Sequence, residues 1–319
     1  MGKNLKYFLT AFLIGLPFWW GTNFLSERLE EFFYWSELSA SPQFLAAEAY
    51  QLSLQNQIKE SGPSRDKLIP NLNIAAQSAI SIFINNDGQE VTLFEKEKDK
   101  QLPVASLTKL MSAKIILENY NPNQIIAISQ RAANLPGNGA KKIRAGQTFR
   151  AIDLLYPALM ESNNTAVYAL AESMGKEEFV ELMNSEAKNL GMENTRFLNP
   201  TGLDENGQHS TAQDLAELTK KLLGDNSFIW KILSLPETRL YSSQGELVHT
   251  VTSTNELLGK IPSIIGGKTG ETPAAGGCLI LVLKAPKGQG FLINIILNSQ
   301  DRFGEMEKLI NWDKNAYNW

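Results

Sequence analysis

The chain has 319 residues and a formal net charge of −4, with 30 Lys and Arg against 34 Asp and Glu. This length can bury a substantial core in one large domain or two small ones, and the acidic balance argues against a nucleic-acid-binding protein. One cysteine excludes an intrachain disulfide, and two histidines are too few for a His/Cys metal cluster. The same scarcity disfavours a serine-histidine catalytic triad, because only His209 and His249 are present.

The first 25 residues predict a membrane anchor. Lys3 and Lys6 precede residues 7–25, which carry no charge and are long enough to span a bilayer. Trp19 and Trp20 lie near the end of this run, as interfacial aromatic residues do. A cleaved signal peptide is the alternative, and it would also export the chain. We therefore expect a single-pass protein of the cell membrane, with its folded domain extracytoplasmic.

Residues 26–74 predict a helical stalk. Ser41-Pro42 combines an N-cap residue with a first-turn proline. The helix is expected to continue to about Glu60, where Ser61-Gly62-Pro63 would end it. This segment would link the anchor to the folded domain.

Residues 75–319 predict one α+β domain. Two β-rich runs, 79–84 and 91–94, flank Asn85-Asn86-Asp87-Gly88, which is a hairpin signal. Helical patterns follow, and strand patterns return after Thr238. The expected helices cover residues 106–118, 153–160, 166–171, 176–190, 214–223 and 303–312, and the expected later strands cover 264–265, 278–283 and 291–297. We infer a helical subdomain, about residues 119–225, inserted between two sheet-forming halves.

The first candidate catalytic pair is Ser106 and Lys109. Three positions separate them at the start of a helix, so they share one face and a lysine amine can reach the serine hydroxyl. A neutral lysine could take the serine proton, and a helix N-terminus would favour the resulting anion. Ser106 could instead be an ordinary capping residue. The spacing also occurs at 64–67 and 185–188, so it is not specific alone.

The second candidate cluster is Ser162-Asn163-Asn164, between two expected helices. It offers a hydroxyl and an amide two residues apart. The same pattern occurs in Ser253-Thr254-Asn255, and helix junctions favour Ser and Asn as caps for structural reasons. This cluster therefore indicates a function only in combination with the other clusters.

The third candidate cluster is Lys268-Thr269-Gly270, which follows Gly266 and Gly267. Glycines weaken a strand unless another group must approach its backbone closely. The Lys268 ammonium and Thr269 hydroxyl could bind a substrate carboxylate, while the strand edge binds the substrate backbone. A β-turn with an exposed lysine is the structural alternative.

Taken in chain order, the three clusters form a signature of class A β-lactamases and penicillin-binding proteins. With further segments, the chain resembles the low-molecular-mass D-alanyl-D-alanine carboxypeptidases from about residue 76 to residue 312. Those segments are Asn199–Asp204, Ser210–Ala216, Thr254–Leu258, Ala275–Leu279 and Asp301–Phe303.

The resemblance implies an antiparallel β-sheet flanked by helices, with an all-helical subdomain and the active site in the cleft between them. It also implies a role for each motif residue. The expected roles are Ser106 as nucleophile, Lys109 as its base, Ser162 as a proton relay to the leaving group, Asn164 as a contact to the substrate amide, and Lys268 with Thr269 as the carboxylate site.

Glu271 departs from the family pattern. It follows Gly270 directly, where many relatives carry an aromatic residue or histidine. By position, the backbone N–H groups of Ser106 and Glu271 would hold the oxyanion. The Glu271 side chain weakens carboxylate binding if it faces the cleft, and has no such effect if it faces solvent.

These features predict a serine-type D-Ala-D-Ala carboxypeptidase that acts on peptidoglycan stem peptides, needs no cofactor and is acylated by β-lactams. A DD-endopeptidase that opens cross-links would use the same residues. A serine β-lactamase is less favoured, because no Glu-x-x-x-Asn of the class A type follows Ser162 in the expected region. A non-hydrolytic wall-binding or β-lactam-sensing module would not need the Ser106 and Lys109 pair.

Overall fold

The computed structural model describes residues 62–319, apart from residues 138, 140 and 226. The predicted anchor and most of the predicted stalk lie outside the described residues, so these assignments stay predictions. None of the helices in the described part is both long enough and apolar enough to cross a membrane. Residues 63–319 form one compact unit.

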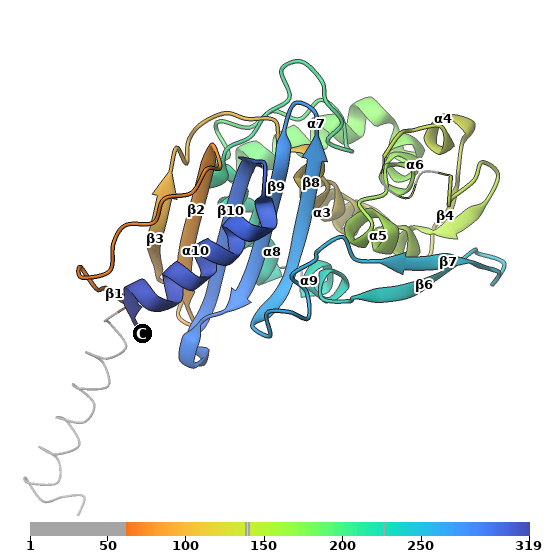
Figure 1. The fold of residues 1–319 in the computed structure, drawn as a ribbon. Coiled ribbons are helices and arrows are strands. Elements are labelled where there is room, and N and C mark those ends of the chain that lie inside the picture. The colour runs from red at the N-terminus through yellow and green to blue at the C-terminus, as the bar shows by residue number, and fades with distance from the viewer. Residues whose placement is uncertain (1–61, 138, 140, 226) are drawn as a thin grey trace, which may run out of the picture. The chain divides into compact units, whose positions relative to one another are not determined.

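A five-stranded antiparallel sheet forms the centre of this unit (Figure 1). Its strands lie in the order β3-β2-β10-β9-β8, with β8 at one edge. The predicted hairpin is confirmed as β2 and β3, and all neighbouring strands are antiparallel. The strands are β2 (Ser78–Asn85), β3 (Glu90–Lys96), β8 (Ile264–Thr272), β9 (Gly276–Lys284) and β10 (Gly290–Ser299).

Both faces of the sheet are covered, because alternate residues of a strand point to opposite sides. Ile80 and Ile82 of β2 belong to one buried cluster, which also contains Leu215 of helix α8 (Ala212–Asp225). Phe83 belongs to the other buried cluster, with Leu309 of helix α10 (Arg302–Ala316). The long apolar runs of β9 and β10 follow from this burial on both faces.

Helices supply the rest of the unit. Every predicted helix of the domain is present, and the sequence did not predict the short helices α4, α9 and η2. The helices are η1 (Ala105–Thr108), α3 (Lys109–Asn119), α4 (Gln130–Ala133), α5 (Ala151–Met160), α6 (Asn164–Met174), α7 (Lys176–Asn189), α8 (Ala212–Asp225), α9 (Ser227–Leu233), η2 (Pro286–Gly288) and α10 (Arg302–Ala316). Helices α4 to α7 lie together beyond the β8 edge of the sheet (Figure 1). Helix α8 packs on β2 and β10, although the sequence places it within the helical subdomain.

Two small two-stranded sheets lie among these helices. Strand β4 (Ile125–Ala127) pairs with β5 (Thr148–Arg150), and β6 (Glu237–Tyr241) pairs with β7 (Leu247–Thr252). Neither pair joins the central sheet. Strand β7 therefore carries residues toward helix α5 rather than toward the sheet.

The two ends of the unit are joined. Strand β1 (Ser64–Arg65) pairs with β11 (Tyr317–Asn318). The Arg65 guanidinium lies over the Trp312 ring, 4.9 Å from its centroid. Residues 63–74 are thus part of the same unit as the sheet, which begins earlier than the expected residue 75.

Candidate active site

Ser106 lies in the short 3-10 helix η1, immediately before α3. Its hydroxyl does not cap either helix, since neither N-cap position of η1 and α3 makes a side-chain bond. Ala105, just before it, has a φ of 48°, a strained value for a residue with a β-carbon. This local backbone turns Ser106 toward the edge strand β8, with which η1 is in contact.

Lys109 binds three oxygen atoms with one amine. Its Nζ lies 2.7 Å from Ser106 Oγ, 2.7 Å from Asn164 Oδ1 and 2.6 Å from the carbonyl oxygen of Thr201. The Asn164 amide is oriented by Nδ2, which donates to the carbonyl of Pro136 at 2.6 Å. The sequence reading predicted the Ser106 contact and missed the other two.

These contacts decide where the lone pair of a neutral Lys109 points. A carbonyl oxygen and an amide oxygen only accept hydrogen bonds. Asn164 Oδ1 and the Thr201 carbonyl therefore take the two N–H groups of a neutral amine. The remaining lone pair faces Ser106 Oγ, so the amine is oriented to accept the serine proton.

The surroundings of Lys109 favour this neutral form. The side chain has no exposed surface. Burial, and to a lesser extent the positive charge of Lys268, hold the pKa of Lys109 well below its usual value. A base that must act near neutral pH needs such a lowered pKa.

Ser162 and Asn164 come from the junction between α5 and α6. Ser162 has a φ of 60°, in the left-handed region that a serine rarely adopts. Asn163 is the structural member of the motif, because its side chain caps α6 by accepting from the Ala166 N–H at 3.0 Å. Ser162 and Asn164 are the members of the motif that can act in the site. The Asn164 amide already accepts a hydrogen bond from Lys109 and donates one to the Pro136 carbonyl.

Lys268 lies behind Ser162. Its side chain is fully buried on β8, and Nζ donates to Ser162 Oγ and to the Thr269 carbonyl oxygen, each at 2.8 Å. The structural alternative, a β-turn with an exposed lysine, is therefore not observed. Gly266, two positions earlier in β8, lets helix α9 pack closely on the strand, since a β-carbon there would lie 3.2 Å from the Trp230 ring.

Burial of Lys268 predicts a pH-dependent stability. Desolvation, and then the Arg302 charge, lower its pKa to about 7, against about 10.4 in an unfolded chain. From about pH 7 to 10 the unfolded state binds a proton that the folded state does not, so stability rises with pH. Below pH 7 the buried, protonated Lys268 destabilises the folded state most, by on the order of 5 kcal/mol.

Lys268→Met should therefore stabilise the protein at pH 6. The lost hydrogen bonds offset about 1 to 3 kcal/mol of the gain, and the advantage should shrink as the pH approaches 10. Urea unfolding at pH 6 and pH 9 measures both effects. A variant that is less stable than wild type by the same amount at both pH values would contradict this expectation.

Thr269 is held by Thr254, at the start of one of the segments that carry the family resemblance. Its Oγ1 lies 2.5 Å from Oγ1 of Thr254, in the second Ser-x-Asn pattern. Thr254 also donates to the Met160 carbonyl oxygen at 3.2 Å. This second pattern thus connects β8 to the end of α5, close to Ser162.

The motif residues surround a cavity of about 230 Å3. Ser106, Ser162, Asn164 and Thr269 line it, whereas Lys109 and Lys268 lie beneath its surface. The other described lining residues are Gly137, Gly202, Leu203, Gly270, Glu271, Thr272 and Arg302. The motif residues therefore present hydroxyl and amide groups to a ligand, and their two lysine amines are buried.

Arg302 and Gly202 are site residues that the motifs did not indicate. Arg302, from the start of α10, is the only cationic side chain among the described residues that line the cavity. Gly202 has a φ of 79°, and a β-carbon there would lie 1.9 Å from the Ala105 carbonyl oxygen. The segments Asn199–Asp204 and Asp301–Phe303 were the only sequence signals for them.

The edge strand also approaches the nucleophile closely. A β-carbon on Gly270 would lie 3.0 Å from the backbone nitrogen of Ser106. The glycine of Lys-Thr-Gly therefore brings β8 against the peptide of Ser106. This proximity suits an oxyanion site made by the N–H groups of Ser106 and Glu271.

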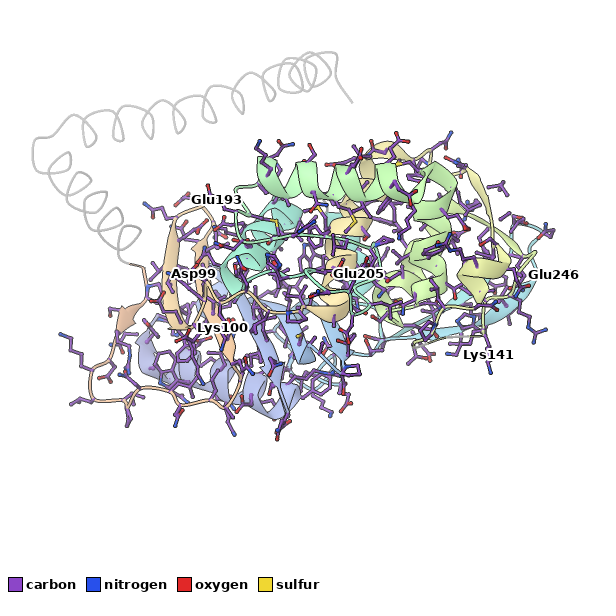
Figure 2. The ribbon with its side chains drawn as sticks, turned by 90° about the horizontal axis from the view of Figure 1, so that it is seen from above. Asp99, Lys100, Lys141, Glu193, Glu205 and Glu246 are labelled. Atoms are coloured by element: carbon purple, nitrogen blue, oxygen red, sulfur yellow. The ribbon has the colours of Figure 1, made fainter. Side chains whose placement is uncertain are left out.

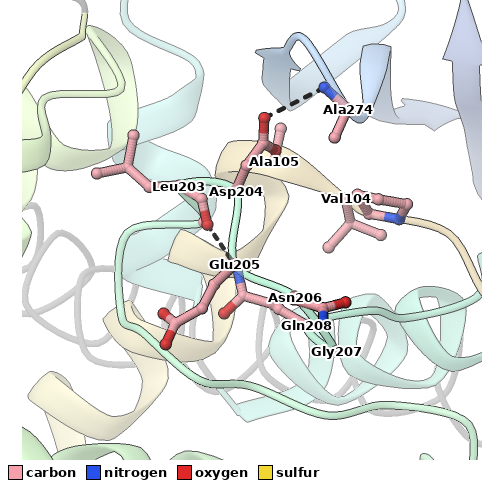
Figure 3. Close-up of a pocket in the computed structure, with 11 residues that line it drawn as sticks. Val104, Ala105, Leu203, Asp204, Glu205, Asn206, Gly207, Gln208 and Ala274 are labelled. Carbon is pink, nitrogen blue, oxygen red and sulfur yellow. Dashed lines mark hydrogen bonds between the residues drawn. The ribbon is translucent and has the colours of Figure 1, made fainter.

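A second cavity of about 310 Å3 adjoins the first (Figure 3). Gly202 and Leu203 line both. Asp204 closes one side, where its carboxylate accepts from the Ala274 N–H at 3.2 Å and from the Thr272 hydroxyl at 2.5 Å. Among the described residues, no group of three or more His, Cys, Asp or Glu side chains could hold a metal ion.

Comparison with known proteins identifies the family. Residues 64–301 match the S11 peptidase family, described as D-alanyl-D-alanine carboxypeptidase. The chain belongs to this family. The predicted resemblance is thereby confirmed, including its relation to low-molecular-mass penicillin-binding proteins.

Individual S11 relatives include both kinds of DD-peptidase. The chain is 32% identical over 254 residues to the D-alanyl-D-alanine carboxypeptidase DacF of Bacillus subtilis, covering 76% of this chain and 64% of DacF. It is 31% identical over 236 residues to the D-alanyl-D-alanine endopeptidase of Pseudomonas aeruginosa, covering 72% of this chain and 74% of that protein. The match thus spans slightly less than two thirds of DacF.

A solved structure has the same fold. The crystal structure of Penicillin-Binding Protein D2 from Listeria monocytogenes, in its cefotaxime-bound form, superposes with a TM-score of 0.67 at 30% identity. The superposition covers 77% of this chain and all of that chain, 100%. The shared fold includes the antiparallel sheet and its helices.

Proposed function

We propose that this S11 peptidase is a serine-type D-Ala-D-Ala carboxypeptidase that removes the terminal D-Ala from peptidoglycan stem peptides. The observation that carries the proposal is the triple contact of Lys109, which leaves one lone pair for Ser106. The family match supports the reaction type. The same Ser106 is expected to be acylated by β-lactams.

Acylation begins with Ser106 Oγ attacking the carbonyl carbon of the penultimate D-Ala. Lys109 takes the hydroxyl proton, and the N–H groups of Ser106 and Glu271 bind the oxyanion. When the tetrahedral intermediate collapses, the amine of the terminal D-Ala leaves with a proton. Ser162 can relay that proton, because its hydroxyl lines the cavity and accepts from Lys268.

Deacylation reverses the roles of the groups. Water enters the position that the D-Ala amine has left and attacks the ester carbonyl. Lys109 or Ser162 accepts its proton, and Ser106 regains its hydroxyl hydrogen. No cofactor is needed for either step, since the nucleophile and base are both side chains of this chain.

The substrate carboxylate is expected at Thr269 and Arg302. Both line the cavity next to Ser106, and a guanidinium matches a carboxylate geometrically. Lys268 would act on this end indirectly, through Ser162 and through its charge. This assignment moves the direct contact from Lys268, as first expected, to Arg302.

A DD-endopeptidase is the second candidate function. The likeness to the Pseudomonas aeruginosa endopeptidase over 74% of its length favours it. Both reactions need the same acyl-enzyme, and they differ in the amine that leaves.

We further propose that residues 1–25 anchor the protein in the cell membrane with the domain outside, which the charge pattern of Lys3 and Lys6 supports.

Digestion of purified muropeptides tests the proposal. The full chain should shorten monomeric pentapeptide by one alanine and release free D-alanine, which chromatography with mass spectrometry detects. Loss of cross-linked dimers, with pentapeptide left intact, would instead assign the endopeptidase. Release of neither product, by protein that is correctly folded, would refute both.

A further inference from the structure

The rim of the catalytic cavity carries an ion pair between Glu271 and Arg302. Glu271 Oε2 lies 2.5 Å from Nη1 of Arg302. Both residues line the cavity. The Glu271 side chain therefore faces neither the cleft alone nor solvent alone. It is 68% exposed, and its carboxylate binds Arg302 at the cavity wall.

No other cationic side chain among the described residues lines the cavity and could bind a substrate carboxylate in place of Arg302. Lys109 and Lys268 are fully buried, and their amines are bonded to other groups of the site. A substrate carboxylate that enters beside Thr269 must therefore compete with the Glu271 carboxylate for one guanidinium.

We propose that Glu271 is a specificity-determining residue, which acts as an internal competitor for Arg302 and reduces the enzyme's preference for substrates that end in a free carboxylate. This inference rests on the proposed function. Most of the Glu271 side chain is in solvent, where an ion pair contributes little. Substrate can consequently displace it, so the competition weakens binding without blocking it.

A supporting role for Glu271 is the opposite possibility. In that case its carboxylate would hold Arg302 in place for the substrate. The guanidinium has other supports, since Nη1 also donates to the Gly270 carbonyl oxygen at 3.2 Å and the group lies 4.9 Å from the Phe303 ring centroid. Arg302 therefore keeps its position without Glu271, and competition is the effect that remains.

A matched pair of peptides measures the effect. The substrates are diacetyl-L-Lys-D-Ala-D-Ala and the same peptide with a C-terminal carboxamide, and the readout is the ratio of kcat/KM for acid to that for amide. In Glu271→Gln this ratio should rise about fivefold, as expected for loss of one exposed charge contact. The rise should come from a lower KM for the acid.

A double-mutant cycle assigns the effect to Arg302. In Arg302→Gln the ratio should fall, and adding Glu271→Gln to that variant should not raise it again. Glu246→Gln is the matched control, because Glu246 is an exposed glutamate that projects from the turn between β6 and β7 (Figure 2). Its ratio should equal that of wild type.

The results separate the inference from the proposed function. An unchanged or lower ratio in Glu271→Gln, with the acid peptide still hydrolysed by wild type, would overturn the inference and leave the function standing. A fivefold rise that persists in the Arg302→Gln background would also overturn it. Hydrolysis of neither peptide by wild type would refute the proposed function itself.

Discussion

Ser106→Ala should abolish the covalent adduct that this protein forms with benzylpenicillin. The β-lactam carbonyl takes the place of the D-Ala-D-Ala carbonyl, and Ser106 Oγ is the hydroxyl that Lys109 Nζ contacts at 2.7 Å. Ser162 has a different partner, Lys268. Intact-protein mass spectrometry should detect one penicilloyl group on wild type and none on the variant.

The wild-type adduct should persist for minutes or longer after free drug is removed. The opened lactam ring stays attached and obstructs the approach of water, whereas D-Ala diffuses away after peptide cleavage. Rapid loss of the adduct with catalytic penicillin hydrolysis would make the protein a β-lactamase. An adduct that still forms in Ser106→Ala would show that the nucleophile is another residue.

Lys109→Met should lower the rate of acylation by about 10^2- to 10^4-fold, the usual contribution of a general base. Methionine has a similar length and no proton acceptor of comparable strength. In wild type the acylation rate should rise with pH as Lys109 loses its proton, with a midpoint well below the usual lysine pKa because burial and Lys268 lower it. This dependence should be absent in the variant.

Stopped-flow acylation by a chromogenic cephalosporin, from pH 5 to pH 10, measures both effects. Ser112→Ala offers a control on the same helix, since Ser112 is buried but donates to the Pro200 carbonyl and not to Ser106. A Lys109→Met rate within tenfold of wild type, or an unchanged pH profile, would assign the base to another group.

Local sequence patterns predicted the elements that local interactions determine. The hairpin at 85–88, the helices α5 to α8 and the pair Ser106 and Lys109 all depend on residues within a few positions of each other. The missed α9 is only seven residues long, which is too short for a clear periodic pattern. It joins the core through Ile229 and Ile232, which are buried by α8, α5 and β8.

Contacts between distant segments were not predictable in the same way. The hydrogen bond from Lys109 to the Thr201 carbonyl joins residues 92 positions apart, and no side-chain pattern identifies a backbone acceptor. The buried Lys268 amine likewise finds its partner Ser162 on another element, 106 positions away in the sequence. Family resemblance supplied the motif residues, whereas the competition between Glu271 and the cavity's ligand required the position of Arg302.

Glu161 is a further example of a residue that only the fold reveals. It precedes Ser162 and is almost fully buried. Its carboxylate accepts from Lys142 at 2.8 Å and lies 3.0 Å from Nε2 of His249. The strand β7 supplies His249, so a sheet that the sequence did not predict supports the segment that carries Ser162.

The pairing of β2 with β10 has a consequence for folding. Residues 78–85 pair with residues 290–297 along the whole of β2, so more than half of the domain lies between two neighbouring strands of the sheet. Such non-local pairing slows folding, because chain entropy must be lost before the contacts form. During synthesis the β2–β3 hairpin has no partner until almost the entire chain has been made. Its apolar faces then need protection from aggregation, and α8, which contacts β2 and is synthesised earlier than β10, can cover one of them.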